Sequence, residues 1–274
     1  IADTTTVPID ELQQSILDLS DETGVAATDI AEAVYNAISA GQDTADAVSY
    51  VETTTKLARA GFTDTASALD LLTSITNAYG LEAKDATKIS DKLITVQNRG
   101  KTTIAQLSSS MGKVIPTASA FGVDLDNIAS AYVVLTKNGI STAESTTYLN
   151  SMINELGKSG TKASKALKSK TGKSFKELMD DGGDLSSVLK VLQDVADESG
   201  VSLADMFGSA EAGKAALSIL SDGGEEFTAS MQAMTEAAGA TSKAFDTVSG
   251  TSSAKMQKSL NQLKNVAIKA GKDL

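Results

Sequence analysis

Glycine followed by an apolar residue recurs at regular intervals through the first half of this 274-residue chain. Successive glycines lie roughly 17 to 22 residues apart, the length of one helix and one short turn. A glycine just beyond a helix end adopts the left-handed backbone conformation without a Cβ penalty, and the apolar residue after it packs onto the last turn. The pattern therefore predicts short helices joined by tight turns at eight glycines: Gly24, Gly41, Gly61, Gly80, Gly100, Gly122, Gly139 and Gly200.

Residues that cap helix N-termini follow several of these glycines. Thr63, Thr102 and Asp124 predict helix starts, and Ser141 with Glu144 predicts a capping box. No alternating β-branched run predicts a strand. The predicted fold class is therefore all-α, a bundle of many short helices with a longer amphipathic helix at the C-terminal end. Apolar residues at helical spacing place the main helices at 9–20, 29–39, 44–60, 65–79, 85–98, 103–115, 125–138, 142–156, 185–198, 210–220 and 225–238.

The composition excludes several kinds of chemistry. The chain has no Cys and no His, so thiol nucleophiles, Ser-His triads and sites built on Cys or His ligands are excluded. Only 4% of the residues are aromatic. We predict no catalytic, metal or cofactor-binding residue.

The charge balance also limits the partners of the chain. The formal net charge is -11, and Arg59 and Arg99 are the only arginines. Because base and phosphate recognition depends largely on arginine, sequence-specific nucleic-acid binding is not expected. No segment has the roughly 18 to 20 uninterrupted apolar residues of a membrane span. The chain begins at Ile1 within an extended arm (1–8) and stops within a helical pattern, so we expect a piece of a longer protein.

Composition shifts predict three parts: a helical core at 1–157, a second helical subdomain at 158–240 and a basic amphipathic helix at 241–274. The Lys/Ser/Gly-rich stretch from Lys158 to Lys173 predicts a mobile surface segment or a weak, exposed helix. The last part has apolar residues at alternating spacings of four and three, typical of a coiled-coil seam. It either projects and self-associates through residues 243–272 or packs back onto the body. The seam residues are Met256, Leu260, Leu263, Ala267 and Ala270.

Two motifs only superficially suggest ligand sites. Thr171 to Ser174 read TGKS, but a phosphate-binding loop has a glycine where Leu167 stands and follows a strand. Asp180 to Asp184 read DDGGD, which lacks the alternating acidic residues and distant Glu of a calcium loop. We interpret both as ordinary turns.

A series of short blocks resembles the core region of phage tail tape-measure proteins. The blocks agree in order and spacing and, with a later block that resembles the closing helix pair of the family, cover about three quarters of the chain. They are AVYNAISAG (33–41), KLARAGFTD (56–64), LDLLTSITNAYGL (69–81), ISDKL (89–93), GKTTIAQL (100–107), IPTASAFGVD (115–124), LTKNGISTAESTTYL (135–149) and LADMFGSAEAGKAALSIL (203–220).

The resemblance implies a structural, non-enzymatic virion protein of a phage or prophage tail. Such a protein is assembled in the host cytoplasm, occupies the lumen of the tail tube, contacts tail tube and assembly chaperone proteins, helps to set tail length and assists genome ejection. The residues leave three alternatives open. They are a helical module that contacts the host envelope during genome passage, a cell-wall hydrolase that uses only carboxylates, and a flagellin-like filament protein.

Overall fold

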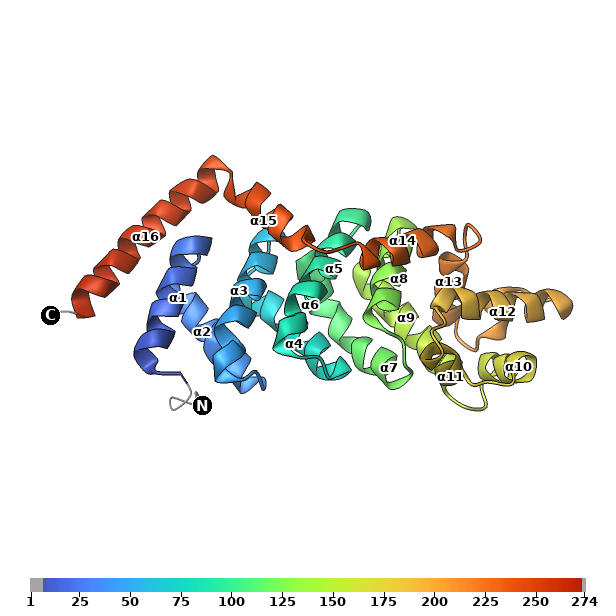
Figure 1. Cartoon of the computed structure of the whole chain (residues 1–274). Coiled ribbons are helices and arrows are strands. Elements are labelled where there is room, and N and C mark those ends of the chain that lie inside the picture. Colours follow the sequence, from blue (N-terminus) through green and yellow to red (C-terminus); the bar gives the residue numbers. More distant parts are fainter. Residues whose placement is uncertain (1–6, 273–274) are drawn as a thin grey trace. The chain divides into compact units, whose positions relative to one another are not determined.

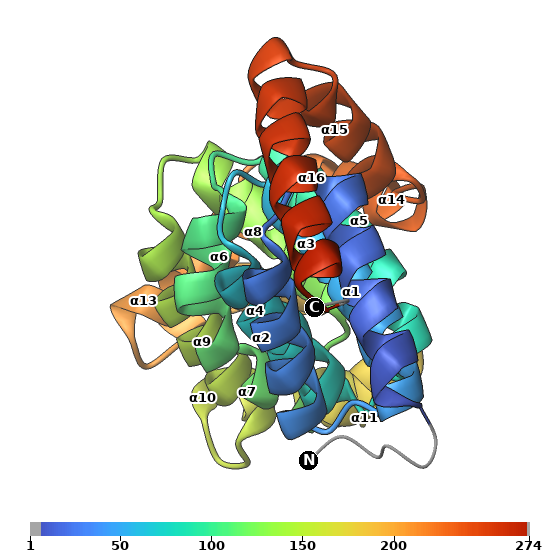
Figure 2. The same cartoon turned by 90° about the vertical axis from the view of Figure 1, so that its left-hand side faces the viewer.

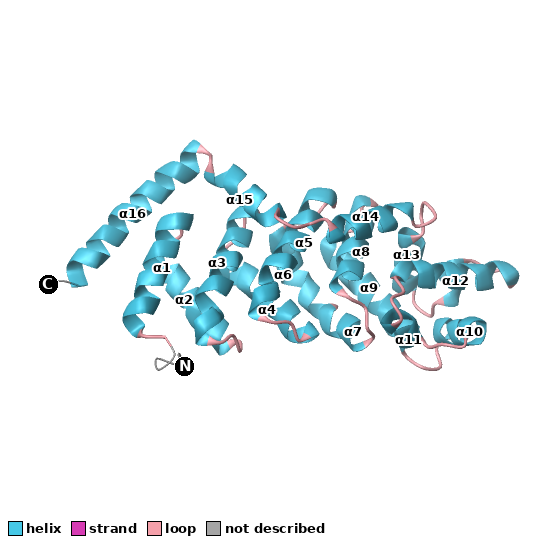
Figure 3. Ribbon diagram, viewed as in Figure 1, coloured by secondary structure: helices cyan, strands magenta, loops and turns pink. Residues whose placement is uncertain are grey.

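All regular structure in the described part of the chain is helical. The structure is a computed structural model that describes residues 7–272, in which sixteen α-helices and three short 3₁₀-helices are joined by loops, with no strand between those two residues (Figure 3). The all-α prediction is confirmed. The predicted extended arm (1–8) lies almost entirely outside the described residues.

The chain divides into two compact units. The first unit comprises residues 1–94 and 239–274, and the second comprises residues 95–238. The predicted boundary at 157/158 falls inside the second unit, whereas the predicted boundary at 240/241 lies two residues from the division between residues 238 and 239. The helices of the first unit are α1 (Ile9–Thr23), α2 (Ala27–Ser39), α3 (Thr44–Ala60), α4 (Thr65–Tyr79), the 3₁₀-helix η1 (Ala83–Asp85), α5 (Ala86–Arg99, whose last turns lie in the second unit), α15 (Ala240–Ser249) and α16 (Ser252–Lys272) (Figure 1).

Helix α3 forms the centre of the first unit. It packs against α2, α4 and α15, and α1 packs against α2, α3 and α16. Tyr50 on α3 is fully buried, and its hydroxyl lies 3.2 Å from that of Thr76 on α4. Burial raises the pKa of Tyr50 to about 12, and the hydrogen bond with Thr76 opposes part of that rise. The phenol therefore stays neutral at physiological pH and acts as a packing group.

Helix α8 has the corresponding place in the second unit. Every residue of α8 from Asn127 to Thr136 is buried, since α9, α13 and α14 pack around it. The hydroxyl of Tyr132 on α8 hydrogen-bonds with that of Thr146 on α9. The helices of this unit are α6 (Ile104–Ser110), η2 (Met111–Lys113), α7 (Ile115–Ala120), α8 (Leu125–Lys137), α9 (Thr142–Gly157), α10 (Lys162–Thr171), α11 (Phe175–Asp180), α12 (Leu185–Glu198), η3 (Leu203–Met206), α13 (Ala210–Ile219) and α14 (Glu225–Thr235).

Two of the eight predicted turn glycines do not have a left-handed backbone. Gly61 has φ −91°, and the next residue, Phe62, has φ +54° instead. Gly100 also lacks a positive φ; a Cβ there would lie 2.8 Å from the Thr136 hydroxyl and 3.0 Å from the Val96 carbonyl oxygen. Gly100 therefore serves close packing rather than backbone reversal. The other six have positive φ: Gly24, Gly41, Gly80, Gly122, Gly139 and Gly200.

Side-chain caps open many of the helices. Asp124 accepts a hydrogen bond from the N–H of Asn127, and Ser141 forms a reciprocal capping box with Glu144. The caps expected at Thr63 and Thr102 are each displaced by one residue, to Asp64 and Thr103. In both places two adjacent residues could act as the cap, and only the second precedes the first helical turn.

The C-terminal part is two helices rather than one. Helix α15 ends at Gly250, and the Thr251 hydroxyl then accepts a hydrogen bond from the N–H of Ala254 to open α16. The stretch from Lys158 to Lys173 contains a regular helix, α10, which buries Ala163 and Leu167. At the start of α10, the Thr161 hydroxyl accepts a hydrogen bond from the N–H of Ser164. Like Thr251 before α16, Thr161 is a local cap that determines where its helix begins.

A distant carboxylate caps α15. Asp91 on α5 is buried, and its two oxygens accept hydrogen bonds of 2.8 Å from the N–H groups of Gly239 and Thr241. The hydroxyls of Ser90 and Thr241 lie 2.7 Å apart beside it. These contacts join two segments of the first unit that are far apart in the sequence.

Replacing Asp91 should destabilise the first unit. We expect Asp91→Ala to lower the free energy of unfolding by about 1–3 kcal/mol, since the buried N–H of Thr241 and the partly buried N–H of Gly239 lose a charged acceptor. Asp91→Asn should cost less because the amide keeps one acceptor oxygen. Urea unfolding of each variant measures the change. Asp70→Ala, at an exposed site on α4, is the control and should stay within about 0.5 kcal/mol of the wild type.

Candidate interaction site

Helix α16 contacts α1 through polar groups. In Figure 2, α16 runs alongside α1, although the two helices come from opposite ends of the chain. The side-chain amide of Asn261 donates hydrogen bonds to the Ser20 hydroxyl (2.6 Å) and the Val25 carbonyl (2.9 Å). Asn265, only 1% exposed, donates to the same hydroxyl and to the Asp21 carboxylate, both at 2.8 Å. Directional hydrogen bonds therefore set the position of α16 on α1.

The two helices also carry opposite charges. Five acidic residues and no basic residue lie in α1, whereas α16 has five lysines and no acidic residue. Lys269 lies 3.7 Å from the Asp21 carboxylate and 4.0 Å from that of Asp18. These groups are partly exposed, so each ion pair contributes little to stability, but together they favour the pairing of α16 with α1.

The opposite face of α16 is apolar and exposed to solvent. Met256 is 66% exposed, Leu260 55% and Leu263 68%. All three belong to the predicted seam, and Ala267 and Ala270, its other members, are exposed as well. The seam therefore does not pack back onto the first unit.

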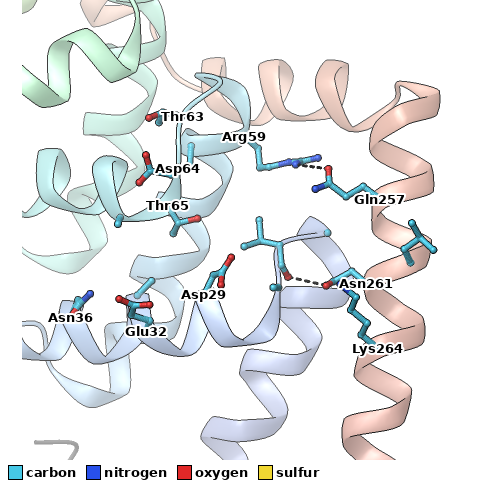
Figure 4. Close-up of a pocket in the computed structure, with 17 residues that line it drawn as sticks. Asp29, Glu32, Asn36, Arg59, Thr63, Asp64, Thr65, Gln257, Asn261 and Lys264 are labelled. Atoms are coloured by element: carbon cyan, nitrogen blue, oxygen red, sulfur yellow. Dashed lines mark hydrogen bonds between the residues drawn. The ribbon is translucent and has the colours of Figure 1, made fainter.

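A pocket of about 500 Å³ lies between α16 and the helices α2, α3 and α4 (Figure 4). Arg59 on α3 and Gln257 on α16 close one side of it, with 3.2 Å between the guanidinium and the amide oxygen. Asp29 and Glu32 line the pocket from α2, and Lys264 lines it from α16. The pocket thus has a mixed polar and apolar lining with charges of both signs.

One carboxylate that lines this pocket serves as a helix cap. The Asp64 carboxylate accepts hydrogen bonds from the backbone N–H and the hydroxyl of Ser67, and these hold its pKa below the ordinary value. The Asp64 carboxylate therefore serves as the cap of α4. No group of three or more potential metal-ligating side chains occurs within residues 7–272.

Phe62 stands at the edge of a second hollow of about 490 Å³, which is also lined by Arg59, Gln257 and Ala254. Its side chain is 79% exposed, and its backbone has the left-handed φ described above. It occupies the position after a helix end where glycine is usual, and the N–H of Thr63 bonds to the carbonyl of Ala58 around it. An exposed aromatic side chain is thus held in a strained backbone conformation.

Of the eight predicted glycines, only Gly24 lines the larger pocket. A Cβ on Gly24 would lie 3.2 Å from Cα of Lys258, so this glycine lets α16 approach the end of α1. Sequence reasoning missed Arg59, Asn261 and Asn265. The one available signal was the presence of two Asn residues four positions apart on the side of α16 opposite the apolar seam.

Comparison with known proteins places the chain in a family. The family model described as phage-related minor tail protein matches residues 13–208. This chain belongs to that family. It is 37% identical to a probable tape measure protein of Clostridium phage phiCD119 over 96% of this chain and 29% of that protein. It is also 23% identical to the tape measure protein of Pneumococcus phage Dp-1 over 58% of this chain and 14% of that protein.

The chain of this phage tail protein thus spans less than a third of the length of these relatives. No solved structure matches it. Within residues 7–272, every helix is too short or too polar to cross a bilayer.

The strain at Phe62 predicts an unusual order of stabilities. We expect Phe62→Gly to be more stable than Phe62→Ala by about 0.5–1 kcal/mol, because alanine retains the cost of the left-handed conformation. At Tyr35, an exposed position within α2, the order should reverse, and the alanine variant should be the more stable. Chemical denaturation of the four variants gives both differences. The same order at the two sites would contradict the strain at Phe62.

The Asn contacts predict local release of α16. Asn261→Ala removes the hydrogen bonds to Ser20 and Val25, at a cost of about 1–2 kcal/mol. Amide hydrogen exchange within 252–272 should then become roughly tenfold faster, with little change in α3 and α4. Ser259→Ala, at an exposed site on the same helix, is the matched control. Equal exchange in the two variants would show that Asn261 does not hold α16 in place.

Proposed function

We propose that this chain is the folded helical core of a tail tape measure protein, a structural component of the phage tail. The observation that carries the proposal is the 37% identity to a probable tape measure protein, which extends over 96% of the chain. The all-helical structure of residues 7–272 is compatible with it.

The proposed location is the lumen of the tail tube, after assembly in the host cytoplasm. There the tail tube and tail assembly chaperone proteins are the proposed partners, and the protein leaves the tube ahead of the genome during ejection. An α-helix advances 1.5 Å per residue, so an extended helical protein converts its residue count into tail length.

The short helices suggest a particular part in this process. The longest described helix, α16, has 21 residues, and its neighbours end at turns. A compact unit of this kind adds much less length than an extended helix of the same residue count. We infer that this segment is a compact body on an extended ruler, and that the glycine turns act as hinges if the helices are ever drawn out.

A structural rather than catalytic role fits the carboxylates. Among the described residues, each carboxyl group with a displaced pKa has it lowered. In Glu226 this results from hydrogen bonding and proximity to Lys137, with Arg99 adding to it; in the others it results from Ser side chains and backbone N–H groups at helix starts. A glycosidase general acid needs the opposite shift. These carboxylates cap helices and form ion pairs.

Tail length provides the test. A tape measure protein that carries this segment is given a second copy of residues 95–238, the contiguous unit. We expect tails of unchanged length by electron microscopy, whereas about 140 residues of extended helix would add roughly 210 Å. Mass spectrometry of the purified tails should detect the duplicated segment.

A duplication of equal length in an extended helical part of the same protein is the control and should lengthen the tail. Growth by the full helical rise on duplicating 95–238 would overturn the compact body. Absence of this segment from purified tails would overturn its place in the tail.

A further inference from the structure

The outer face of α16 has the geometry of a helix-pairing surface. Successive residues of a helix are rotated by about 100°, so Met256, Leu260 and Leu263 fall within a narrow arc. Met256 and Leu263 lie opposite Asn261, and Leu260 lies at the edge of the arc, where it also lines the pocket. The face bound to α1 is polar and already occupied, whereas this seam is exposed. The pairing surface is therefore separate from the contact that holds α16 in the first unit.

The lysines of α16 are arranged so that they do not oppose such pairing. Lys255, Lys258 and Lys269 project to the sides or toward α1, and only Lys264 borders the seam. Besides Lys264, the residues that would flank a paired seam are uncharged: Ser252, Gln257, Ser259, Val266 and Gly271. Two copies of α16 can therefore approach without like charges meeting across the interface.

We propose that a second copy of this chain binds here, by antiparallel pairing of two α16 seams. The seam residues decrease in size along the helix, from Met256, Leu260 and Leu263 to Ala267 and Ala270. Antiparallel pairing places Met256 opposite Ala267 of the second copy and Leu260 opposite Leu263. Large residues then face small ones at the ends of the seam and leucines meet at its centre, which keeps the helices evenly spaced.

Charge gives this face no attraction to a lipid surface. Helix α16 has five lysines and α1, which packs against it, has five acidic residues, so the helix pair has no excess positive charge. The whole chain carries a net charge of -11, which opposes adsorption to anionic lipid. Two copies repel each other through the same net charge, so their pairing relies on the apolar seam, where like charges do not meet. Since that seam is small, we expect a weak, concentration-dependent dimer.

Sedimentation of the full chain from about 1 µM to about 1 mM tests the proposal. We expect the wild type to pass from monomer to dimer, and Leu263→Ser to raise the dissociation constant at least tenfold. Leu263 is mostly exposed, so the variant should keep its helical content by circular dichroism. Ile268→Ser is the matched control, because Ile268 is exposed on the same helix but lies off the seam. It should dimerise like the wild type.

Orientation is tested by cross-linking, which is unambiguous because the chain has no cysteine. Met256→Cys mixed with Ala267→Cys should give a mixed disulfide under copper–phenanthroline oxidation, and each variant alone should link poorly. Efficient linking of each variant to itself would overturn the antiparallel arrangement. A monomer at every concentration, or equal loss of dimer in Leu263→Ser and Ile268→Ser, would overturn the pairing. Binding of a monomeric chain to phosphatidylglycerol vesicles would assign the face to membrane instead.

Discussion

The backbone N–H groups at helix N-termini are the main polar groups for which this structure must supply hydrogen-bond acceptors. Every helix leaves its first N–H groups without intrahelical acceptors, and many short helices multiply that requirement. Adjacent Ser, Thr or Asp side chains cap many of them, but three helix starts also receive a side chain from a distant segment. Asp91 binds the start of α15, Asn127 accepts from the N–H of Leu185 at α12, and Glu155 accepts from Ser209 at α13. These contacts fix helix packing as well as helix ends.

Such distant contacts mark the limit of what this sequence predicts. Local signals sufficed for most helices, because periodicity and capping act within a few residues; α3 and α4 begin and end at the predicted residues. The break at Gly250 was missed because the lysines from Lys243 to Lys272 indicated one continuous basic helix, although the apolar seam begins only at Met256. The three predicted parts differ from the two observed units because residues 239–274 belong with residues 1–94. That association depends on contacts of Asp91 and Asn261 rather than on any local change in composition.

The candidate site was less predictable than the fold for the same reason. Arg59 and Gln257 lie almost 200 positions apart, and nothing near either residue indicates the contact between them. Phe62 was expected to be the apolar residue that packs after a turn glycine. Instead Gly61 keeps an ordinary φ and Phe62 takes the left-handed position, so its ring remains exposed. A one-residue shift of the turn thus converts a packing residue into a surface one.

The two faces of α16 explain why the sequence identified the apolar seam but not which face of the helix contacts the first unit. An apolar stripe normally indicates the face that a helix buries against its own domain. Here amide hydrogen bonds from Asn261 and Asn265, with complementary charge on α1, bind the opposite side. A polar contact of this kind is specific in register yet leaves the apolar stripe available. The first unit can therefore hold α16 in a defined position while presenting its seam to a partner.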